Sequence, residues 1–207
     1  MLTNEIINEI LGITESYQAP QVLLDSMLDD DQRASLFARF FEHERDMCYE
    51  WFQMYFEEEQ AQRKQSKQDF TPTSVSMLVA ELSVSGNTYF ECAAGTGSML
   101  VQAWDRHRKR TSPWNYGARS FWYHVEELSD RAIPFLLFNM SIRGMNGVIV
   151  HGDSLTREAK AVYFIRNMGN VGFSDVIPMP KTEVLEKELN ITFVGVVEVK
   201  QKVPPTI

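Results

Sequence analysis

The sequence predicts an α/β fold in which a mostly parallel sheet is flanked by helices and follows a helical N-terminal region. Between about residues 68 and 155, helical patterns alternate with short β-rich runs, which is typical of a parallel sheet. A glycine-containing turn, Gly95-Thr96-Gly97, joins the first β-rich run to a helical pattern. Acidic residues stand at the ends of three successive β-rich runs. Together these observations indicate a sheet with a ligand site at one edge.

Composition places the chain among globular proteins. Its 207 residues are enough for one substantial domain with a helical appendage, and 44% of them are hydrophobic and 12% aromatic, which excludes a disordered chain. Cys48 and Cys92 lack CxxC spacing, so we expect reduced thiols and no metal site. The sequence shows no signal-peptide pattern and no apolar run of the ~18 residues that a membrane span needs. We expect a cytoplasmic protein that does not contact membrane.

The charge balance bears on possible partners. With 20 Lys and Arg against 28 Asp and Glu, the formal net charge is -8, which argues against tight autonomous binding to nucleic acid. Two basic clusters, at 63–67 and 106–110, are typical of solvated charges near helix ends. A nucleic-acid substrate would therefore call for help from a partner.

Residues 1–66 are predicted to form a helical region. Isoleucines and leucines recur at helical spacing in residues 6–11, and a longer aromatic pattern begins at Leu36 and continues to Phe56. We expect this aromatic face to pack against a neighbouring domain.

Residues 67–207 are predicted to form the α/β domain, which reads as truncated or degenerate after about residue 156. A helix is expected to begin at Thr71-Pro72, because proline suits the first helical position. Strands are expected at 88–90, 121–125 and 148–150, with helices after Gly97 and at 133–142. Weaker patterns indicate strands at 161–165 and 192–199 and a helix at 183–189.

The acids at the strand ends define the expected site. Glu91 ends the first strand, Glu127 follows the second and Asp153 follows the third. In open α/β sheets ligands bind outside the carboxyl ends of the strands, so these acids converge on one cleft. The glycines let a ligand approach the backbone at a helix N-terminus. An acid can accept hydrogen bonds from ribose hydroxyls, so a cofactor with a ribose and an adenine amine but no phosphate suits the cleft.

Two phosphate-binding motifs are excluded. The dinucleotide pattern GxGxxG requires a third glycine where this chain has Leu100, which argues against a nicotinamide oxidoreductase. No Gly-Lys-Ser/Thr follows the glycines either, so a Walker A loop is absent.

A more specific resemblance comes from motifs spread over residues 68–155. In order they are Gln68-Asp69-Phe70-Thr71-Pro72, then Phe90-Glu91-Cys92-Ala93-Ala94-Gly95-Thr96-Gly97-Ser98-Met99-Leu100, then Glu127 with Asn139 twelve residues on, and Gly152-Asp153-Ser154-Leu155. This order resembles adenine-specific DNA methyltransferases, above all the modification subunits of type I restriction systems and their phage or mobile-element relatives. The resemblance implies a Rossmann-like S-adenosylmethionine-dependent methyltransferase fold with a preceding helical region.

The resemblance also implies roles for individual residues. Phe70, Thr71 and Pro72 would lie against the methionine end of S-adenosylmethionine, Glu127 would hold the ribose hydroxyls, and Asp153 would accept from the adenine amine. The full set of implied cofactor-binding residues is Phe70, Thr71, Pro72, Glu91, Ala93, Gly95, Gly97, Glu127, Asp153 and Ser154. Glu126, beside Glu127, is not expected to take part.

The chain departs from the family at the catalytic motif. That motif is Asn/Asp/Ser-Pro-Pro-aromatic, and the sequence does not contain it; residues 173–180 fall where it should stand. The first motif usually reads Asp-Pro-x-x-Gly, whereas this chain has Glu91-Cys92-Ala93-Ala94-Gly95. No catalytic residue can therefore be named.

Two functions follow from these observations. The first is a DNA methyltransferase-like protein that transfers a methyl group from S-adenosylmethionine to the exocyclic amine of adenine in DNA, with a specificity subunit or other partner supplying what is missing. The alternative is a catalytically degenerate methylase-fold module that binds or regulates another protein of a restriction-modification or mobile-element system.

Overall fold

Helices make up the N-terminal part of the chain. The computed structural model describes residues 2–62, 74–76, 78–79, 86–112, 116–169 and 172–195. The first four helices are α1 (Asn4–Leu11), α2 (Ala19–Met27), α3 (Asp30–His43) and α4 (Gln53–Gln62), with a short 3-10 turn at Ser16–Gln18. Thr3 and Asp29 cap α1 and α3 by accepting backbone N–H groups three residues on.

The aromatic pattern from residue 36 to 56 does not form one continuous helix. Helix α3 ends at His43, and α4 begins only at Gln53. The Glu44 carboxylate accepts the N–H groups of Arg45 and Asp46, and the Asp46 carboxylate accepts that of Cys48. These local bonds satisfy the backbone in a non-helical conformation, which is how acidic side chains compete with helix formation.

The sheet has six strands in the described part of the chain. They are β1 (Thr88–Cys92), β2 (Trp122–Glu127), β3 (Gly147–Gly152), β4 (Glu158–Arg166), β5 (Asp175–Pro178) and β6 (Thr192–Phe193). The order is β1-β2-β3-β4-β5, and β6 pairs with β4. Strands β1, β2 and β3 are parallel, β4 is antiparallel to both β3 and β5, and β6 is parallel to β4.

Helices connect the parallel strands. Helix α6 (Ser98–Arg110) links β1 towards β2, a 3-10 turn at Ala118–Ser120 precedes β2, and α7 (Ile133–Ile142) links β2 to β3. Helix α8 (Glu183–Leu189) stands at the position expected from the sequence. The α/β architecture predicted from the alternating patterns is confirmed, with three of the five strand pairings parallel.

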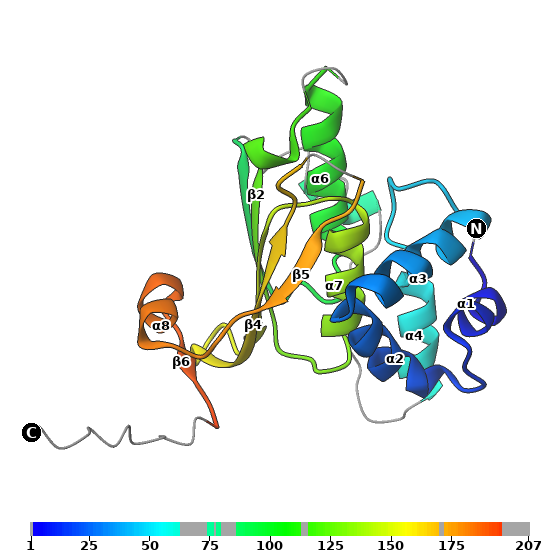
Figure 1. The fold of residues 1–207 in the computed structure, drawn as a ribbon, viewed down its shortest axis with the longest axis horizontal. Helices are drawn as coiled ribbons and strands as arrows, with labels where there is room; N and C mark the ends of the chain where they lie inside the picture. The colour runs from blue at the N-terminus through cyan, green and yellow to red at the C-terminus, as the bar shows by residue number, and fades with distance from the viewer. Residues whose placement is uncertain are drawn as a thin grey trace, which may run out of the picture.

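Helix α7 occupies the centre of the molecule. It lies between the sheet and the N-terminal helices (Figure 1), and all of its residues are buried. Phe138 makes ring contacts with Phe37, Phe40 and Phe52 at centroid distances of 5.1, 4.8 and 4.9 Å. Ring pairs at these distances add to the gain from burial. The aromatic pattern at 36–56 thus packs against the sheet domain, as its spacing predicts.

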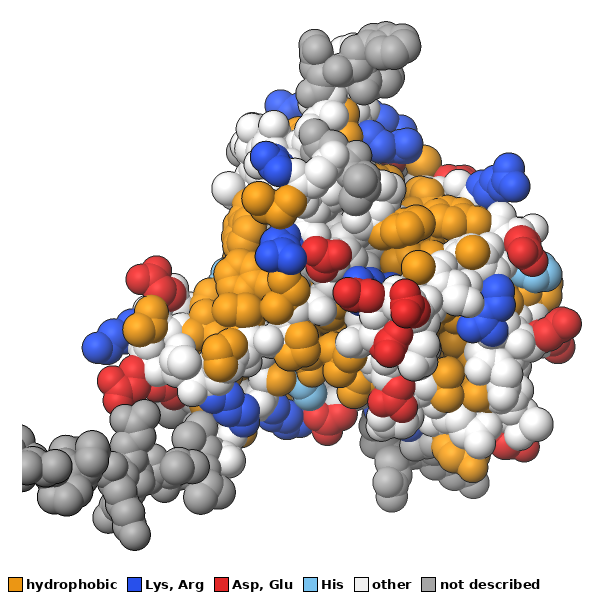
Figure 2. All heavy atoms as spheres, viewed as in Figure 1, with side chains coloured by type: hydrophobic (Ala, Val, Ile, Leu, Met, Phe, Trp, Pro, Cys, Tyr) orange, Lys and Arg blue, Asp and Glu red, His pale blue; other side chains and the backbone are white. Residues whose placement is uncertain are grey.

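The opposite face of the sheet is covered differently. Helix α8 lies on this side (Figure 1), where a second core contains Val148, Val150 and Phe193. Towards β1 the face is more open, since Phe90 and Trp122 remain 59% and 39% exposed. Figure 2 shows hydrophobic side chains at the surface over the strands. None of the helices in the described ranges is both long and apolar enough to cross a membrane.

We expect Phe138→Ala to lower the free energy of unfolding by about 3–5 kcal/mol, because it leaves a cavity among aromatic rings. Urea denaturation followed by both tryptophan fluorescence and circular dichroism measures this change. The exposed Val184→Ala serves as control and should change stability by less than about 0.5 kcal/mol. Loss of the N-terminal helices alone, with the sheet unaffected, would contradict a shared core.

Candidate functional site

The turn after β1 has an unusual backbone. Ala93, Gly95 and Gly97 adopt positive φ angles of 60°, 58° and 101°. Only glycine adopts this conformation without steric cost, so Ala93 carries local strain. The chain turns here from the end of β1 into α6, whose N-cap is Gly97. Strained backbone conformations of this kind are common at ligand sites, so the turn is a candidate ligand site.

The two glycines serve different purposes. A Cβ at Gly97 would lie 3.0 Å from Leu136 Cδ1, so Gly97 lets the turn pack closely against α7. Among the residues that the structure describes, no atom lies within 4 Å of a Cβ built at Gly95. The described part of the chain therefore leaves space for a ligand beside Gly95, whereas Leu136 fills the space beside Gly97. The sequence does not distinguish these roles.

Glu127 ties the turn to the end of β2. Its Oε2 accepts the Gly95 N–H at 2.7 Å, and its Oε1 accepts the Ser129 N–H at 2.7 Å. The carboxylate is almost fully buried. Bonds from backbone N–H groups to a carboxylate are short and strong, so Glu127 fixes the position of Gly95 relative to the neighbouring strand.

Glu91 lies behind the turn, on the helix-covered face of β1. Its carboxyl group is buried and accepts hydrogen bonds from the Tyr89 hydroxyl at 3.0 Å and from the Leu100 backbone. Burial raises the pKa of Glu91 to about 8, and the negative charge of Glu127 adds to this rise. At neutral pH the Glu91 carboxyl is therefore mostly protonated.

Asp153 begins the tight turn that joins β3 to β4. Its Oδ1 accepts the N–H groups of Leu155 and Thr156 at 2.8 and 3.3 Å, and its own N–H donates to the Glu158 carbonyl. Ser154 lies within this turn, which leads directly into the antiparallel strand β4. Asp153 stands beyond the end of β3, the neighbour of β2, so the acids of the second and third strand ends share one edge of the sheet.

Glu126 stabilises this edge of the sheet through an ion pair. Its carboxylate is buried and accepts two hydrogen bonds from the Arg157 guanidinium, at 2.8 and 3.0 Å. Arg157 also donates to the carbonyls of Leu189 and Asn190, at the C-terminal end of α8. This bidentate ion pair, with a buried carboxylate and a partly exposed guanidinium, ties the β3–β4 turn to β2 and α8. Glu126 thus has a structural role at the edge of the candidate site.

A profile of the N-6 DNA methylase family matches residues 44–188, which is more than half of the chain. The chain belongs to the N-6 DNA methylase family. The match confirms the resemblance read from the motifs and begins well before β1, within the segment that joins α3 to α4. This DNA methylase-like chain therefore carries family sequence in its N-terminal part as well as in its sheet.

One solved structure similar to the methylase-like chain is described as a modification subunit of a type I restriction enzyme from Vibrio vulnificus YJ016. It shares 15% sequence identity with a TM-score of 0.37, over 54% of this chain and 22% of that subunit. The similarity thus spans less than a quarter of the subunit's length. No curated protein matches the sequence significantly.

The structure places seven of the ten predicted cofactor-binding residues, in two groups. Glu91, Ala93, Gly95, Gly97 and Glu127 come together around the turn. Asp153 and Ser154 lie in the neighbouring β3–β4 turn. Phe70, Thr71 and Pro72 lie outside the described residues.

Two buried residues next to the turn are not among the predicted site residues. Asn139 Nδ2 donates to the Thr96 carbonyl at 2.8 Å and to Glu50 Oε1 at 2.6 Å. Asn139 is part of a family motif, but its contact is not evident from spacing. Glu50 gave one signal, since it is an acid within an otherwise aromatic and apolar stretch.

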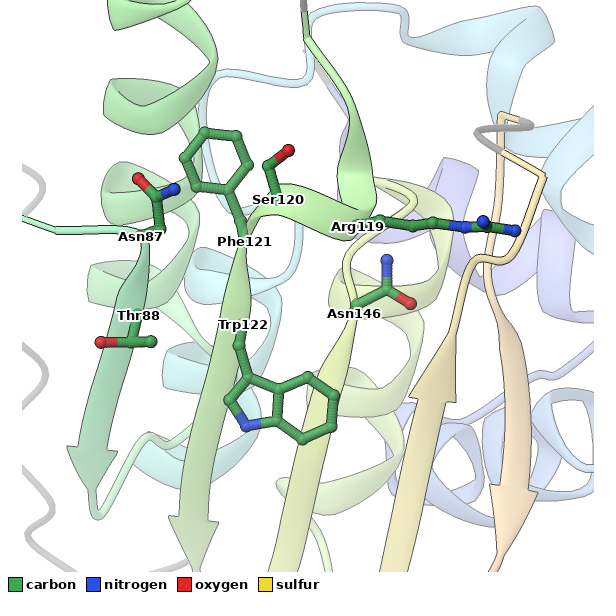
Figure 3. Close-up of a pocket in the computed structure, with 7 residues that line it drawn as sticks. All are labelled: Asn87, Thr88, Arg119, Ser120, Phe121, Trp122 and Asn146. Carbon is green, nitrogen blue, oxygen red and sulfur yellow. The ribbon is translucent and has the colours of Figure 1, made fainter.

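A separate pocket opens at the other end of the strands (Figure 3). It is lined by Asn87, Thr88, Arg119, Ser120, Phe121, Trp122 and Asn146, which stand where β1, β2 and β3 begin. The methylase-like chain therefore has a hollow that does not coincide with the glycine turn. Within the described ranges, no cluster of His, Cys, Asp and Glu could hold a metal ion.

We expect Glu91→Gln to reduce the pH dependence of stability. In the unfolded chain a glutamate ionises near pH ~4.3, whereas in the folded chain Glu91 ionises near pH 8. The unfolded state therefore loses this proton first, and the free energy of unfolding falls as pH rises through this window. Thermal unfolding at several pH values between about 5 and 9 should show a shallower fall in stability for Glu91→Gln than for the wild type.

The exposed Glu158→Gln serves as the control and should retain the wild-type slope. Glu50 contributes in the same direction, because burial raises its pKa to about 7, so part of the slope should remain in Glu91→Gln. An unchanged slope in Glu91→Gln would mean that its carboxyl group is not buried in this way.

Proposed function

We propose that this chain binds S-adenosylmethionine at the carboxyl ends of β1, β2 and β3 and takes part in methyl transfer to the exocyclic amine of adenine in DNA. The observation that carries the proposal is the Gly95 turn held by Glu127, with open space beside Gly95. Membership in the N-6 DNA methylase family supports this chemistry.

The residues at this edge fit the proposed cofactor. Gly95 would allow its close approach, and the N-terminus of α6 presents backbone N–H groups that suit its carboxylate. The second lone pairs of the Glu127 oxygens would accept ribose hydroxyls. Asp153 Oδ1 already accepts two N–H groups, which leaves Oδ2 to accept from an adenine amine. We also include Phe70, Thr71 and Pro72 in the proposed site, against the methionine end of the cofactor, on the sequence resemblance alone.

When bound, S-adenosylmethionine supplies an electrophilic methyl group on a sulfonium. The adenine amine would form the new N–C bond as the S–C bond breaks, with its electron pair left on the sulfur of S-adenosylhomocysteine, and the methylated amine would then release one proton to solvent. This chain would contribute mainly by holding its ligand in place, since proximity and orientation can account for much of a transfer rate. The polar residue and aromatic ring that receive the target base are not evident in the sequence.

A partner is part of the proposal. The formal charge of -8 makes strong autonomous binding to DNA phosphates unfavourable. We infer that DNA and the missing base-binding groups reach this edge through a specificity subunit or another protein. We place this activity in the cytoplasm.

The second candidate function is a binding or regulatory module with a degenerate methylase fold. Two observations favour it: the absence of the Asn/Asp/Ser-Pro-Pro-aromatic motif from the sequence, and the antiparallel course of β4, which follows the turn at Asp153. Transfer of labelled methyl from S-adenosylmethionine to adenine-containing DNA, with and without partner subunits, separates the two functions. Transfer that Asp153→Asn abolishes supports the enzyme, whereas cofactor binding without any transfer supports the module.

We expect Gly95→Ala to weaken binding of S-adenosylmethionine and S-adenosylhomocysteine by about tenfold or more, because its methyl group fills the open space beside the turn. In the wild type, ligand at ~100 times its dissociation constant should stabilise by about 2.7 kcal/mol, a rise in Tm of roughly 5–10 °C. Thermal-shift titration measures both effects.

Gly12→Ala is a matched control. Gly12 also has a positive φ, of 69°, and no described atom lies within 4 Å of a Cβ built there. It is the C-cap of α1, in the N-terminal helical region and not in the glycine turn. Both substitutions should lower Tm through the same backbone strain. Only Gly95→Ala should lose the response to ligand. The absence of any response in the wild type would overturn cofactor binding and favour the module.

A further inference from the structure

A buried polar network lies directly behind the glycine turn. It joins Glu50, in the segment between α3 and α4, to Asn139 and Arg143 at the end of α7. All three side chains are buried, and Glu50 is only 6% exposed. Burying charged groups is costly unless they are well paired, so a buried network of this kind indicates a structural or functional role.

The network fixes one peptide group of the turn. Asn139 Nδ2 donates to the Thr96 carbonyl at 2.8 Å, and on the other side of the same peptide the Gly97 N–H donates to the Ala94 carbonyl at 2.9 Å. Both polar groups of the Thr96–Gly97 peptide are thus held. The orientation of this peptide sets the left-handed conformation of Gly97, from which α6 begins.

Glu50 holds the Asn139 amide in place. Its Oε1 accepts the second Nδ2 hydrogen of Asn139 at 2.6 Å and the Phe52 N–H at 2.9 Å. Asn139 Oδ1 accepts from the Arg143 guanidinium at 2.6 Å. The amide therefore has a partner on each polar atom, which leaves it a single favourable orientation.

Arg143 holds the segment that carries Glu50. Its guanidinium donates to the carbonyls of Met47 and Tyr49, at 3.1 and 2.6 Å, and lies 5.7 Å from the centre of the Trp51 ring. The irregular segment 44–52 is thus fixed on α7, and Glu50 reaches the turn from behind rather than from the ligand side.

We propose that Glu50 and Asn139 are positioning residues that hold the Thr96–Gly97 peptide in the conformation that binds the cofactor. The segment 44–52 then sets cofactor affinity without touching the cofactor. This inference rests on the proposed function, in that it assigns the residues that shape the same site.

The test measures the dissociation constant of S-adenosylhomocysteine by calorimetry on the full chain. Glu50→Ala and Asn139→Ala should each weaken binding by about tenfold or more. Glu50→Gln keeps an oxygen that accepts from Asn139, so it should restore affinity to within about twofold of the wild type. If Glu50→Ala does not fold, Asn139→Ala and the shorter Glu50→Asp provide the same comparison.

Asn146→Ala is the matched control for loss of a buried asparagine. Asn146 is also buried and exchanges hydrogen bonds with the backbone of Asn167, but it stands at the other end of the strands. It should lower Tm and leave the dissociation constant unchanged. Equal weakening by Asn146→Ala and Asn139→Ala, or wild-type affinity in Glu50→Ala, would overturn the inference.

A second readout needs no ligand. In the ligand-free protein, the amide NMR resonances of Thr96 and Gly97 should move in Glu50→Ala and Asn139→Ala and return in Glu50→Gln. Failure of the wild type to bind S-adenosylhomocysteine would refute the proposed function, whereas unmoved resonances in Glu50→Ala would refute the positioning role. The two failures are therefore distinguishable.

Discussion

The burial of α7 on all sides is the constraint on which the rest of the structure depends. A helix that is apolar around its whole circumference must have protein on every side, and here the sheet and the N-terminal helices provide it. Phe138 anchors the aromatic rings of α3 and the following segment, while Leu136 packs against Gly97. One helix therefore couples the N-terminal helices to the turn at the strand ends. The N-terminal region belongs to the same folded core as the sheet.

This coupling explains how a strained turn is held. The Ala93–Gly97 segment is fixed at Gly95 by Glu127 from β2 and at Thr96 by Asn139 from α7. Both bonds are short, at 2.7 and 2.8 Å, and the Glu127 and Asn139 side chains are buried, so the surrounding structure holds in place a backbone that would otherwise relax. Beside Gly95, by contrast, no atom of the described residues lies within 4 Å of a built Cβ. Rigidity behind a ligand site and openness in front of it reduce the ordering cost of binding.

Much of the fold could be predicted from local patterns, and the missing parts depend on distant contacts. The strand expected at 88–90, which extends to Cys92 in the structure, and the helices at 133–142 and 183–189 follow from periodicity and turn residues. The break after His43 was not predicted, because Glu44 and Asp46 satisfy the backbone only in that particular geometry. In the site, strand-end acids and glycines were identified by spacing. The Glu50–Asn139 bond, between residues 89 positions apart, leaves no local trace.

The central claim is that the ligand site lies at the glycine turn and not at the pocket where the strands begin. The most direct measurement is a titration of the isotope-labelled chain with S-adenosylhomocysteine, followed by amide NMR resonances. The account predicts that the largest shifts fall on residues 94–97 and on Glu127 and Ser129. Shifts centred on Asn87, Arg119 and Trp122, or no saturable shifts at all, would contradict it.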